Sequence, residues 1–511
     1  MLDYALNFAK FKVVFLEFTT IFSVLFFAIS LIFAAFLSNR TFKIAVGIIA
    51  LIYIFALCFD LLLFFVFGKH FGLFVITFFR TSIESAPIAS FAREIAILVM
   101  ICVAIILLSI IITVRILHFR HSSKLSILFM PCILTAFFLN PLYDAAREYY
   151  LQLNPPVEAI KKQVYPYLAI PHPKAPIKRK NIVYIFLESF DRAYTDERNF
   201  AKLTPHLNAL KNRIDFSEIH QVVYTGFTIK GLFGSYCATN YTFASAKDMA
   251  SENFTKNIVC ASEILHSLGY HTYFMKGADL NFQGTRGFLR QRDYDEIKGR
   301  DEILAVDPSV HTNEWGVDDD DMLRVAWNDF ERLNKVGRPF LFSLLTIGTH
   351  APSGFIPRSC EGLEYNENAV PMLRAVHCSD LLVSKFIEQI RSSPYAANTI
   401  IVLQNDHPLF YKNAIDGGFG DGLKDERDLF VILDDDLDGE FEIKKRGTSF
   451  DTFTTVLGYL GILDEMNFGR NLLSRESLPF DADDEFFVNA SRILSKLSYD
   501  ESVRAQQESS K

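Results

Sequence analysis

Four nearly charge-free apolar stretches dominate the first 142 residues, and each is long enough to cross a bilayer as a helix. They cover residues 13–37, 44–67, 95–117 and 125–142. A further apolar stretch, from Phe71 to Phe79, is too short for an ordinary span, so the expected number is four, or five if this stretch also crosses. The first stretch exceeds the usual apolar core of a signal peptide, and no clear cleavage pattern follows it. We therefore expect a retained transmembrane bundle over residues 1–142.

The short loop between the third and fourth stretches carries Arg115, Arg120 and Lys124. Short loops rich in Lys and Arg remain in the cytoplasm, so the last crossing exports everything that follows it. The sequence thus predicts that residues 143–511 lie outside the cytoplasm.

The exported part has a mixed, globular composition. Residues 143–180 are rich in Pro and charge and are expected to form a juxtamembrane stalk, whose basic residues 178–180 either touch lipid headgroups or belong to a solvated linker. Residues 181–490 are expected to form the main domain, and residues 491–511 a polar tail that is a frayed helix or disordered. The formal net charge of −8 argues against a nucleic-acid partner.

Within the main domain, β-branched and aromatic runs alternate with helical patterns. The principal runs and patterns are residues 182–187, 203–212, 271–275, 340–345, 384–390, 400–403 and 451–460. This alternation is typical of an α/β domain with a mainly parallel sheet.

The seven cysteines divide between the two parts. Three lie within the apolar stretches and four beyond them: Cys58, Cys102 and Cys132, then Cys237, Cys260, Cys360 and Cys378. An even number of exported cysteines suits disulfides, and proximity in sequence suggests the pairs Cys237–Cys260 and Cys360–Cys378. A zinc site is the alternative, but the C-x2-C spacing typical of zinc sites is absent.

Polar side chains follow three of the strand-like runs. Glu188 follows residues 182–187, Asp406 and His407 follow 400–403, and His350 follows 340–345. The carboxyl ends of parallel strands share one edge of a sheet, so these side chains can converge there. Carboxylate and imidazole ligands suit a divalent cation. Singly, each has another explanation: a helix cap for Glu188, a turn for Asp406 and a packed loop residue for His350.

A threonine precedes a helix expected over residues 229–237. Thr228 at this position is either a helix cap or part of an anion site, because unpaired amides at a helix N-terminus stabilise phosphate. A nearby metal can also make a hydroxyl nucleophilic. The sequence pattern alone leaves both alternatives open.

Several motifs in one order resemble the phosphoglycerol transferases over about residues 181–465. They are Tyr184-Ile185-Phe186-Leu187-Glu188-Ser189 with Tyr194, Thr228-Ile229-Lys230-Gly231, Asn313-Glu314-Trp315-Gly316, Thr349-His350 and Asp406-His407. That family is similar to lipoteichoic acid synthases and phosphoethanolamine transferases. The resemblance implies a sulfatase-like, alkaline-phosphatase-type α/β domain behind a membrane bundle, and it is strongest to members that act on periplasmic glucans.

The resemblance also implies roles for individual residues. Glu188, Asp406 and His407 would bind one divalent metal ion, either Mn²⁺, Zn²⁺ or Mg²⁺, and Thr228 would be both a metal ligand and the nucleophile. His350 would hold the phosphate or donate to a leaving oxygen. The family's substrate-gripping stretch matches Asn281, Phe282 and Arg286, while Trp315 matches a motif tryptophan that is a substrate contact or a core aromatic. The four exported cysteines also match family positions.

The implied reaction moves phosphoglycerol from a membrane phospholipid, phosphatidylglycerol, to a glycan, with the protein in the bacterial inner membrane and its catalytic domain in the periplasm. Two departures bear on substrate preference: Tyr224-Thr225-Gly226-Phe227 replaces a Gly-Thr-x-Tyr or Gly-Thr-x-Trp pattern, and Lys230 replaces a small residue. The C/S-x-P-x-R signature of true sulfatases is absent, which argues against sulfate-ester hydrolysis.

Three alternative functions stay open at this point. The first is transfer of phosphoethanolamine to lipid A or a glycan, the second is release of phosphoglycerol to water, and the third is noncatalytic glycan binding by a membrane protein. The sequence does not specify the oligomeric state.

Overall fold

The computed structural model describes residues 18–67, 70–72, 75–76, 92–119, 123–242, 246–249, 251, 254–351, 353–366, 370–409 and 427–509. The described residues fall into two compact units, one of N-terminal helices that ends at Asn154 and one that begins at Pro155.

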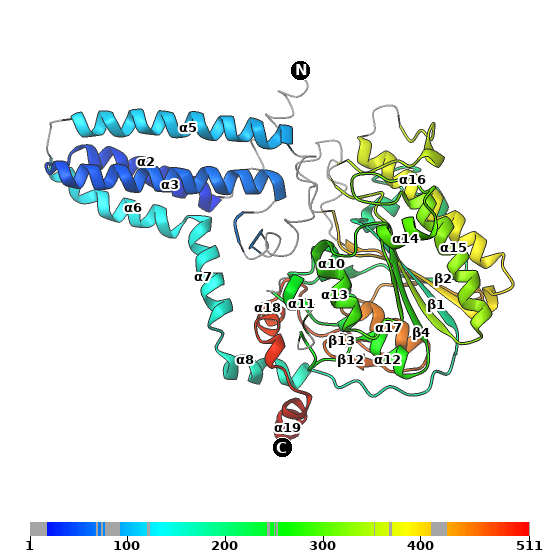
Figure 1. The fold of residues 1–511 in the computed structure, drawn as a ribbon. Coiled ribbons are helices and arrows are strands. Elements are labelled where there is room, and N and C mark those ends of the chain that lie inside the picture. The colour runs from blue at the N-terminus through cyan, green and yellow to red at the C-terminus, as the bar shows by residue number, and fades with distance from the viewer. Residues whose placement is uncertain are drawn as a thin grey trace. The chain divides into compact units, whose positions relative to one another are not determined.

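The first unit is entirely helical (Figure 1). Its helices are α2 (Phe18–Ala35), α3 (Arg40–Phe67), α5 (Ala92–His118), η2 (Lys124–Leu128), α6 (Phe129–Phe138) and α7 (Pro141–Leu153). Within the described residues, two helical stretches are long and apolar enough to cross a membrane, Arg40–Phe64 and Ile95–Ile116. A third span results if the bent pair Lys124–Phe138 and Pro141–Leu153 counts as one.

This outcome differs from the four expected spans. The second and third stretches are confirmed as α3 and α5, whereas the described apolar part of the first, Thr20–Ala35, is shorter than a full span. The fourth breaks with a bend of 59°. There Asn140 caps α7 by accepting a hydrogen bond from Leu142 N, and a proline at the first turn starts a new helix. Much of the stretch from Phe71 to Phe79 lies outside the described residues.

The second unit is an α/β domain. Its strands are β1 (Asn181–Leu187), β2 (Arg213–Phe216), β3 (Ile219–His220), β4 (His271–Lys276), β5 (Glu296–Lys298), β6 (Phe340–Leu345), β7 (Thr399–Asn405), β8 (Arg427–Asp428), β9 (Phe430–Leu433), β10 (Glu440–Ile443), β11 (Gly447–Thr448), β12 (Glu465–Met466) and β13 (Gly469–Arg470). Its longer helices are α8 (Val157–Val164), α10 (Thr228–Cys237), α12 (Ala261–Ser267), α13 (Thr285–Arg290), α14 (Arg300–Val306), α15 (Asp319–Val336), α16 (Pro371–Arg391), α17 (Asp451–Tyr459), α18 (Glu485–Arg492) and α19 (Tyr499–Ser509).

Short helical turns complete the second unit: η3 (Tyr165–Tyr167), η4 (Arg192–Thr195), α9 (Pro205–Ala209), α11 (Ala246–Met249), η5 (Phe282–Gly284), η6 (Arg358–Cys360), η7 (Ala396–Asn398) and η9 (Leu494–Lys496).

An eight-stranded sheet with the order β10-β2-β9-β7-β1-β6-β4-β5 forms the centre of this domain. The strands β7, β1, β6, β4 and β5 are parallel, and β9 pairs antiparallel with β7. Figure 1 shows α10, α12 and α17 toward one face of the sheet, and α15 and α16 toward the other. The expected mainly parallel α/β architecture is therefore confirmed.

Burial on both faces explains the sequence of β1. All seven of its residues are buried, as expected for a strand covered by helices on each side. On one face, the ring of Tyr184 stacks on Phe453 of α17 at 4.8 Å between centroids, and Phe186 lies 5.6 Å from Tyr236 of α10. These contacts fix α10 and α17 against the strand at the centre of the sheet.

The expected stalk and tail pack more closely than the sequence indicated. Ile160 and Val164 of α8 belong to the buried core of the second unit. In α19, Ser502 is fully buried and its hydroxyl donates to the carbonyl oxygens of Tyr165 and Leu168. Residues 499–509 of the expected tail thus form a helix, α19, which covers the turn that follows α8.

The four cysteines beyond the apolar stretches form two disulfides in the structure. Cys237 at the end of α10 is bonded to Cys260, and Cys360 is bonded to Cys378 of α16. These are the pairs suggested by proximity in sequence.

Close packing between α10 and β7 leads to a stability prediction. A Cβ atom at Gly231 would lie 1.9 Å from the backbone oxygen of Asp406. Alanine usually stabilises a helix interior relative to glycine, but here Gly231→Ala forces backbone apart. We expect it to lower the free energy of unfolding by about 2 kcal/mol or more, measured by thermal and denaturant unfolding. Gly226→Ala is the control, since its Cβ would meet no atom within 4 Å. Equal stability of the two variants would contradict the prediction.

Candidate active site

Three neighbouring strands bring the expected polar residues to one edge of the sheet. Glu188 directly follows β1, and Asp406 and His407 directly follow β7, which pairs with β1 up to Leu187 opposite Asn405. The amide of Asp406 donates to the carbonyl oxygen of Leu187 at 3.3 Å. Because β6 pairs with the other side of β1, the segment after it carries His350 to the same edge.

Glu188, Asp406 and His407 form a buried cluster whose side-chain ligand atoms lie within 4.8 Å of one another. Their exposed fractions are only 2%, 1% and 1%. His407 Nε2 lies 3.6 Å from Glu188 Oε1 and 3.5 Å from Asp406 Oδ2. Oxygen and imidazole ligands at this spacing are what a divalent cation needs.

Thr228 is the first residue of α10 and points to this cluster. Its hydroxyl Oγ1 donates to Glu188 Oε2 at 3.2 Å. The N-cap position itself is held by Phe227, which makes no side-chain cap hydrogen bond. The threonine is therefore not the cap of α10, and its hydroxyl lies against the carboxylate instead.

Burial sets the electrostatics of the cluster. Loss of hydration raises the pKa of Glu188, and the nearby Asp406 raises it further; loss of hydration also raises the pKa of Asp406. Asp406 Oδ2 is buried without a hydrogen-bond donor among the described residues. Two buried carboxylates with an unsatisfied oxygen are costly unless a cation neutralises them. The residues present therefore fit a divalent metal ion.

Backbone carbonyls orient the two histidines. His407 Nδ1 donates to Pro408 O at 2.8 Å, and His350 Nδ1 donates to Ala351 O at 2.9 Å. A carbonyl oxygen can only accept, so each neutral ring has its lone pair on Nε2. Burial lowers the pKa of both histidines, which favours this neutral form. His407 can thus act as a metal ligand and His350 as a proton acceptor.

Two aromatic residues surround His350. The Trp315 ring stacks on the His350 ring with centroids 3.6 Å apart, and the Phe282 ring meets Trp315 edge-on at 5.2 Å. His350 Nε2 lies 3.9 Å from Glu188 Oε1. Trp315 and Phe282 are thus placed beside the cluster, where Trp315 fixes the imidazole plane.

Asn281 and Arg286, the other expected substrate contacts, interact with each other. Arg286 Nε donates to Asn281 Oδ1 at 3.3 Å, and Arg286 NH2 pairs with Glu302 at 2.8 Å. The structure places this pair on the segment that contains Phe282, with Arg286 already engaged by a carboxylate.

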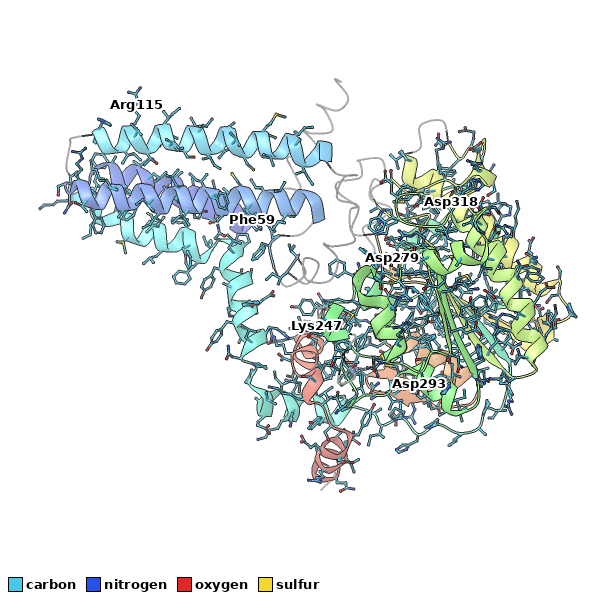
Figure 2. The ribbon with its side chains drawn as sticks, in the orientation of Figure 1. Phe59, Arg115, Lys247, Asp279, Asp293 and Asp318 are labelled. Atoms are coloured by element: carbon cyan, nitrogen blue, oxygen red, sulfur yellow. A yellow bond between two sulfur atoms is a disulfide. The ribbon has the colours of Figure 1, made fainter. Side chains whose placement is uncertain are left out.

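Three residues that support the site were not singled out from the sequence. The Ser189 hydroxyl donates to Glu188 Oε1, and its amide donates to Asp406 Oδ1, both at 2.9 Å. Asp319, next to Asp318 labelled in Figure 2, accepts from the amides of Ile347 and Gly348 at 2.8 Å and so fixes the segment that leads to His350. Gln283 Oε1 accepts from Ile229 N at 3.0 Å, next to Thr228.

Local sequence offered a signal for one of them. Ser189 adjoins Glu188, at the position where a strand ends in polar residues. Asp319 sits among four consecutive aspartates at the start of α15 and reads as an ordinary acidic first turn. Gln283 lies within the substrate-gripping stretch that the resemblance indicated, between Phe282 and Arg286, but it was not named as a site residue.

The α/β domain that carries this site is similar to known proteins. The family model described as Sulfatase matches residues 180–462. Phosphoglycerol transferase I of Salmonella agona (strain SL483) is 36% identical over 332 residues, which cover 63% of this chain and 42% of that protein. The chain therefore spans less than half the length of this curated relative.

Solved structures agree on the fold. A protein of the alkaline phosphatase superfamily from Vibrio parahaemolyticus aligns with a TM-score of 0.51 at 21% identity, covering 63% of this chain and 79% of that one. The lipoteichoic acid synthase LtaP from Listeria monocytogenes aligns with a TM-score of 0.50 at 18% identity, covering 69% and 97%. With the family match extending over more than half of its length, the chain belongs to the sulfatase family.

Proposed function

We propose that this chain transfers phosphoglycerol from phosphatidylglycerol to an extracytoplasmic glycan through a covalent intermediate on Thr228. The observation that carries the proposal is the Thr228 hydroxyl held 3.2 Å from Glu188 within the buried Glu188, Asp406 and His407 cluster. The 36% identity to a phosphoglycerol transferase favours this donor over phosphatidylethanolamine.

In the first step, Thr228 Oγ1 attacks the phosphorus of the donor. A new P–O bond forms to Thr228, the P–O bond to diacylglycerol breaks, and the hydroxyl proton of Thr228 moves toward Glu188 Oε2, its hydrogen-bond acceptor. Burial favours the neutral His350 in the free protein, but the anionic phosphodiester beside it favours uptake of a proton on Nε2, and the imidazolium then gives this proton to the leaving diacylglycerol oxygen. The site is then ready for the second substrate.

In the second step, a hydroxyl of the glycan attacks the same phosphorus. His350 Nε2 takes the proton of that hydroxyl, and Thr228 Oγ1 leaves with the proton returned from Glu188. Trp315 holds the imidazole plane during both transfers, because it stacks on the ring. One nucleophile can thus serve a lipid donor and a water-soluble acceptor in turn.

Glu188, Asp406, His407 and Thr228 would together hold one divalent cation, Mn²⁺, Zn²⁺ or Mg²⁺. When bound, such an ion neutralises the two carboxylates and stabilises negative charge on the phosphoryl oxygens. Within the cluster, Asp406 Oδ2 has no hydrogen-bond donor among the described residues, and such an ion would neutralise it.

The location follows from the helices and the cysteines. Arg40–Phe64 and Ile95–Ile116 are long and apolar enough to hold the chain in a bilayer, and the two disulfides of the α/β domain suit an oxidising compartment. These features support our proposal that the protein lies in the bacterial inner membrane with its catalytic domain in the periplasm.

Replacement of the nucleophile tests the covalent step. Thr228→Ala should lower the transfer rate at least about a thousandfold, because the attacking oxygen is lost. Its melting temperature should stay close to that of the wild type, and metal binding should largely persist through Glu188, Asp406 and His407. Thr228→Ser keeps a hydroxyl and should retain measurable turnover. A Thr228→Ala variant with the wild-type rate would rule out this mechanism.

Metal removal tests the cluster. Chelation should abolish transfer, and Mn²⁺, Zn²⁺ or Mg²⁺ should restore it. Added metal should also raise the melting temperature of the wild type, since a ligand at 100 times its Kd stabilises by about 2.7 kcal/mol. Asp406→Asn should lose most of that shift. The control is Asp451→Asn, which alters a buried carboxylate outside the cluster that accepts hydrogen bonds from Thr448, Arg470 and Ser477. This variant should show the full shift in melting temperature. Equal shifts in both variants would argue against this site.

A transfer assay with labelled lipids tests the donor and the reaction type. Purified protein is given metal, a glucan and glycerol-labelled phosphatidylglycerol or, in parallel, labelled phosphatidylethanolamine. We expect diacylglycerol release and label on the glucan only from the first donor. Label from the second donor alone would make the protein a phosphoethanolamine transferase, and label released to water would make it a hydrolase. Turnover of neither lipid would support a noncatalytic role.

A further inference from the structure

The α/β domain contains a polar cavity of about 580 Å³ that none of the residues of the candidate metal cluster line. Among the described residues that line it, only Ala193 is apolar. Three guanidinium groups and three carboxylates account for most of the lining: Arg192, Arg198, Arg427, Asp196, Glu197 and Glu442. A cavity with this lining is suited to a ligand that forms many hydrogen bonds.

The directions of the strands place this cavity at the same edge of the sheet as the candidate active site. Strand β9 is antiparallel both to β7 and to β2, so β2 runs parallel to β7, and β10 is parallel to β2. The lining residue Ser217 directly follows β2, and Glu442 lies near the end of β10. The cavity is therefore at the carboxyl ends of the strands, where Asp406 follows β7.

The walls of the cavity are joined to the segments that carry the metal cluster. Turn η4 begins at Arg192, on the connection that leaves β1 through Glu188. Just before this turn, Asp191 Oδ2 accepts from the amide of Leu409 at 3.0 Å, on the segment that follows β7. Asp191 also forms a β-bridge with Asp428 of β8, the strand that supplies a lining arginine. These contacts fix the cavity relative to the cluster.

The charges of the cavity do not select an anion. Arg192 pairs with Asp215 at 2.8 Å, and Arg427 pairs with Glu218 at 2.7 Å. The lining itself holds as many carboxylates as guanidinium groups. A hydroxyl group can both donate to a carboxylate and accept from a guanidinium. A neutral ligand with many hydroxyl groups, such as a glycan, therefore matches the lining.

The two sides of the metal cluster differ in polarity. On the side of β6 and β4, the Phe282 ring packs against Trp315. On the side of β2 and β10, the cavity offers almost no apolar surface among the described residues, so an alkyl chain would gain little free energy by entering it. The cavity thus fits a water-soluble substrate better than a lipid.

We propose that this cavity binds the glycan acceptor and directs one of its hydroxyl groups to the phosphorylated Thr228. The proposal rests on the transfer reaction proposed above. The hydroxyl oxygen bonds to phosphorus, its proton passes to His350, and Thr228 Oγ1 leaves. Strand β2 is two strands away from β7, which corresponds to about 10 Å. The acceptor must therefore be an oligosaccharide that spans the cavity and the cluster, rather than a single sugar.

The test uses the full-length protein with two substitutions in the cavity. Ala193→Phe fills part of the cavity, and Glu442→Gln removes a charged acceptor at nearly the same shape. Glu440→Gln is the control for the second, because Glu440 lies on the same face of β10 but pairs with Lys211 outside the lining. Ala397→Phe is the control for the first, since it adds the same ring to another short turn, η7, at an exposed position.

Three measurements separate acceptor binding from donor chemistry. Calorimetry measures the binding of neutral glucose oligosaccharides with α and β linkages, in the absence of lipid. Transfer assays give the KM for a glucan and the KM for phosphatidylglycerol vesicles. Labelling of the protein by phosphatidylglycerol without any acceptor reports the first step alone.

Ala193→Phe and Glu442→Gln should each weaken oligosaccharide binding and raise the KM for the glucan about tenfold or more. The KM for the vesicles, the labelling of the protein and the melting temperature should stay close to those of the wild type. Both control variants should bind and transfer like the wild type. A purely structural role of the cavity would instead lower the melting temperature and impair both substrates.

Other outcomes overturn the proposal. These are wild-type protein that binds none of the oligosaccharides, cavity variants that bind them as the wild type does, and an equal rise in both KM values. Binding of glycerol 1-phosphate or inorganic phosphate that the two cavity variants abolish would make the cavity an anion site instead. Oligosaccharide binding that depends on Ala193 and Glu442, in a wild type that transfers from neither lipid, would sink the proposed transfer reaction but retain the glycan site.

Discussion

The carboxylates of Glu188 and Asp406 are buried within one cluster, where loss of hydration raises the free energy of their ionised forms. Hydrogen bonds from adjacent residues offset part of this cost. Ser189 donates to both carboxylates, through its hydroxyl to Glu188 and through its amide to Asp406, and the His407 amide donates to Asp406 Oδ1 at 2.8 Å. Helix α10 comes close enough for Thr228 to donate to Glu188 only because Gly231 has no side chain against the Asp406 backbone. The remaining oxygen, Asp406 Oδ2, receives no hydrogen bond among the described residues.

Sequence reasoning found the parts of this site that depend on local patterns. The strands β1 and β7 are buried along their whole length, so they read as continuous apolar runs, and the polar residue at each end stands out. Asp319 acts through hydrogen bonds from two residues 28 and 29 positions away, and Gln283 through one hydrogen bond from a residue 54 positions away. Such contacts leave no periodic pattern in the sequence. Lys276 ends an apolar run just as Glu188 does, but a lysine there does not suggest a metal ligand.

Outside the site, the structure differs from the sequence-based predictions for the same reason, namely contacts and breaks that leave no periodic pattern. Helix α19 is polar, and its place against Tyr165 depends on a few contacts, such as that of Ser502, between residues more than 300 positions apart. The apolar stretch that ends at residue 142 has the hydropathy of a span, yet a cap at Asn140 followed by Pro141 starts a new helix direction. Average hydropathy cannot resolve a break made by two residues.

Lys230, which departs from the family pattern, shows how a buried lysine can be stabilised without an ion pair. It is fully buried on α10, its Nζ donates to Thr242 O at 3.2 Å, and the Tyr241 ring lies 5.3 Å away. A carbonyl and an aromatic face thus solvate this cation. Lys276 has weaker partners: its Nζ donates to the Thr285 hydroxyl, and the Phe282 ring centre lies 6.0 Å away. Asp406 Oδ2, which has no hydrogen-bond donor among the described residues, is a place where the domain gives up stability to keep the capacity to bind a cation.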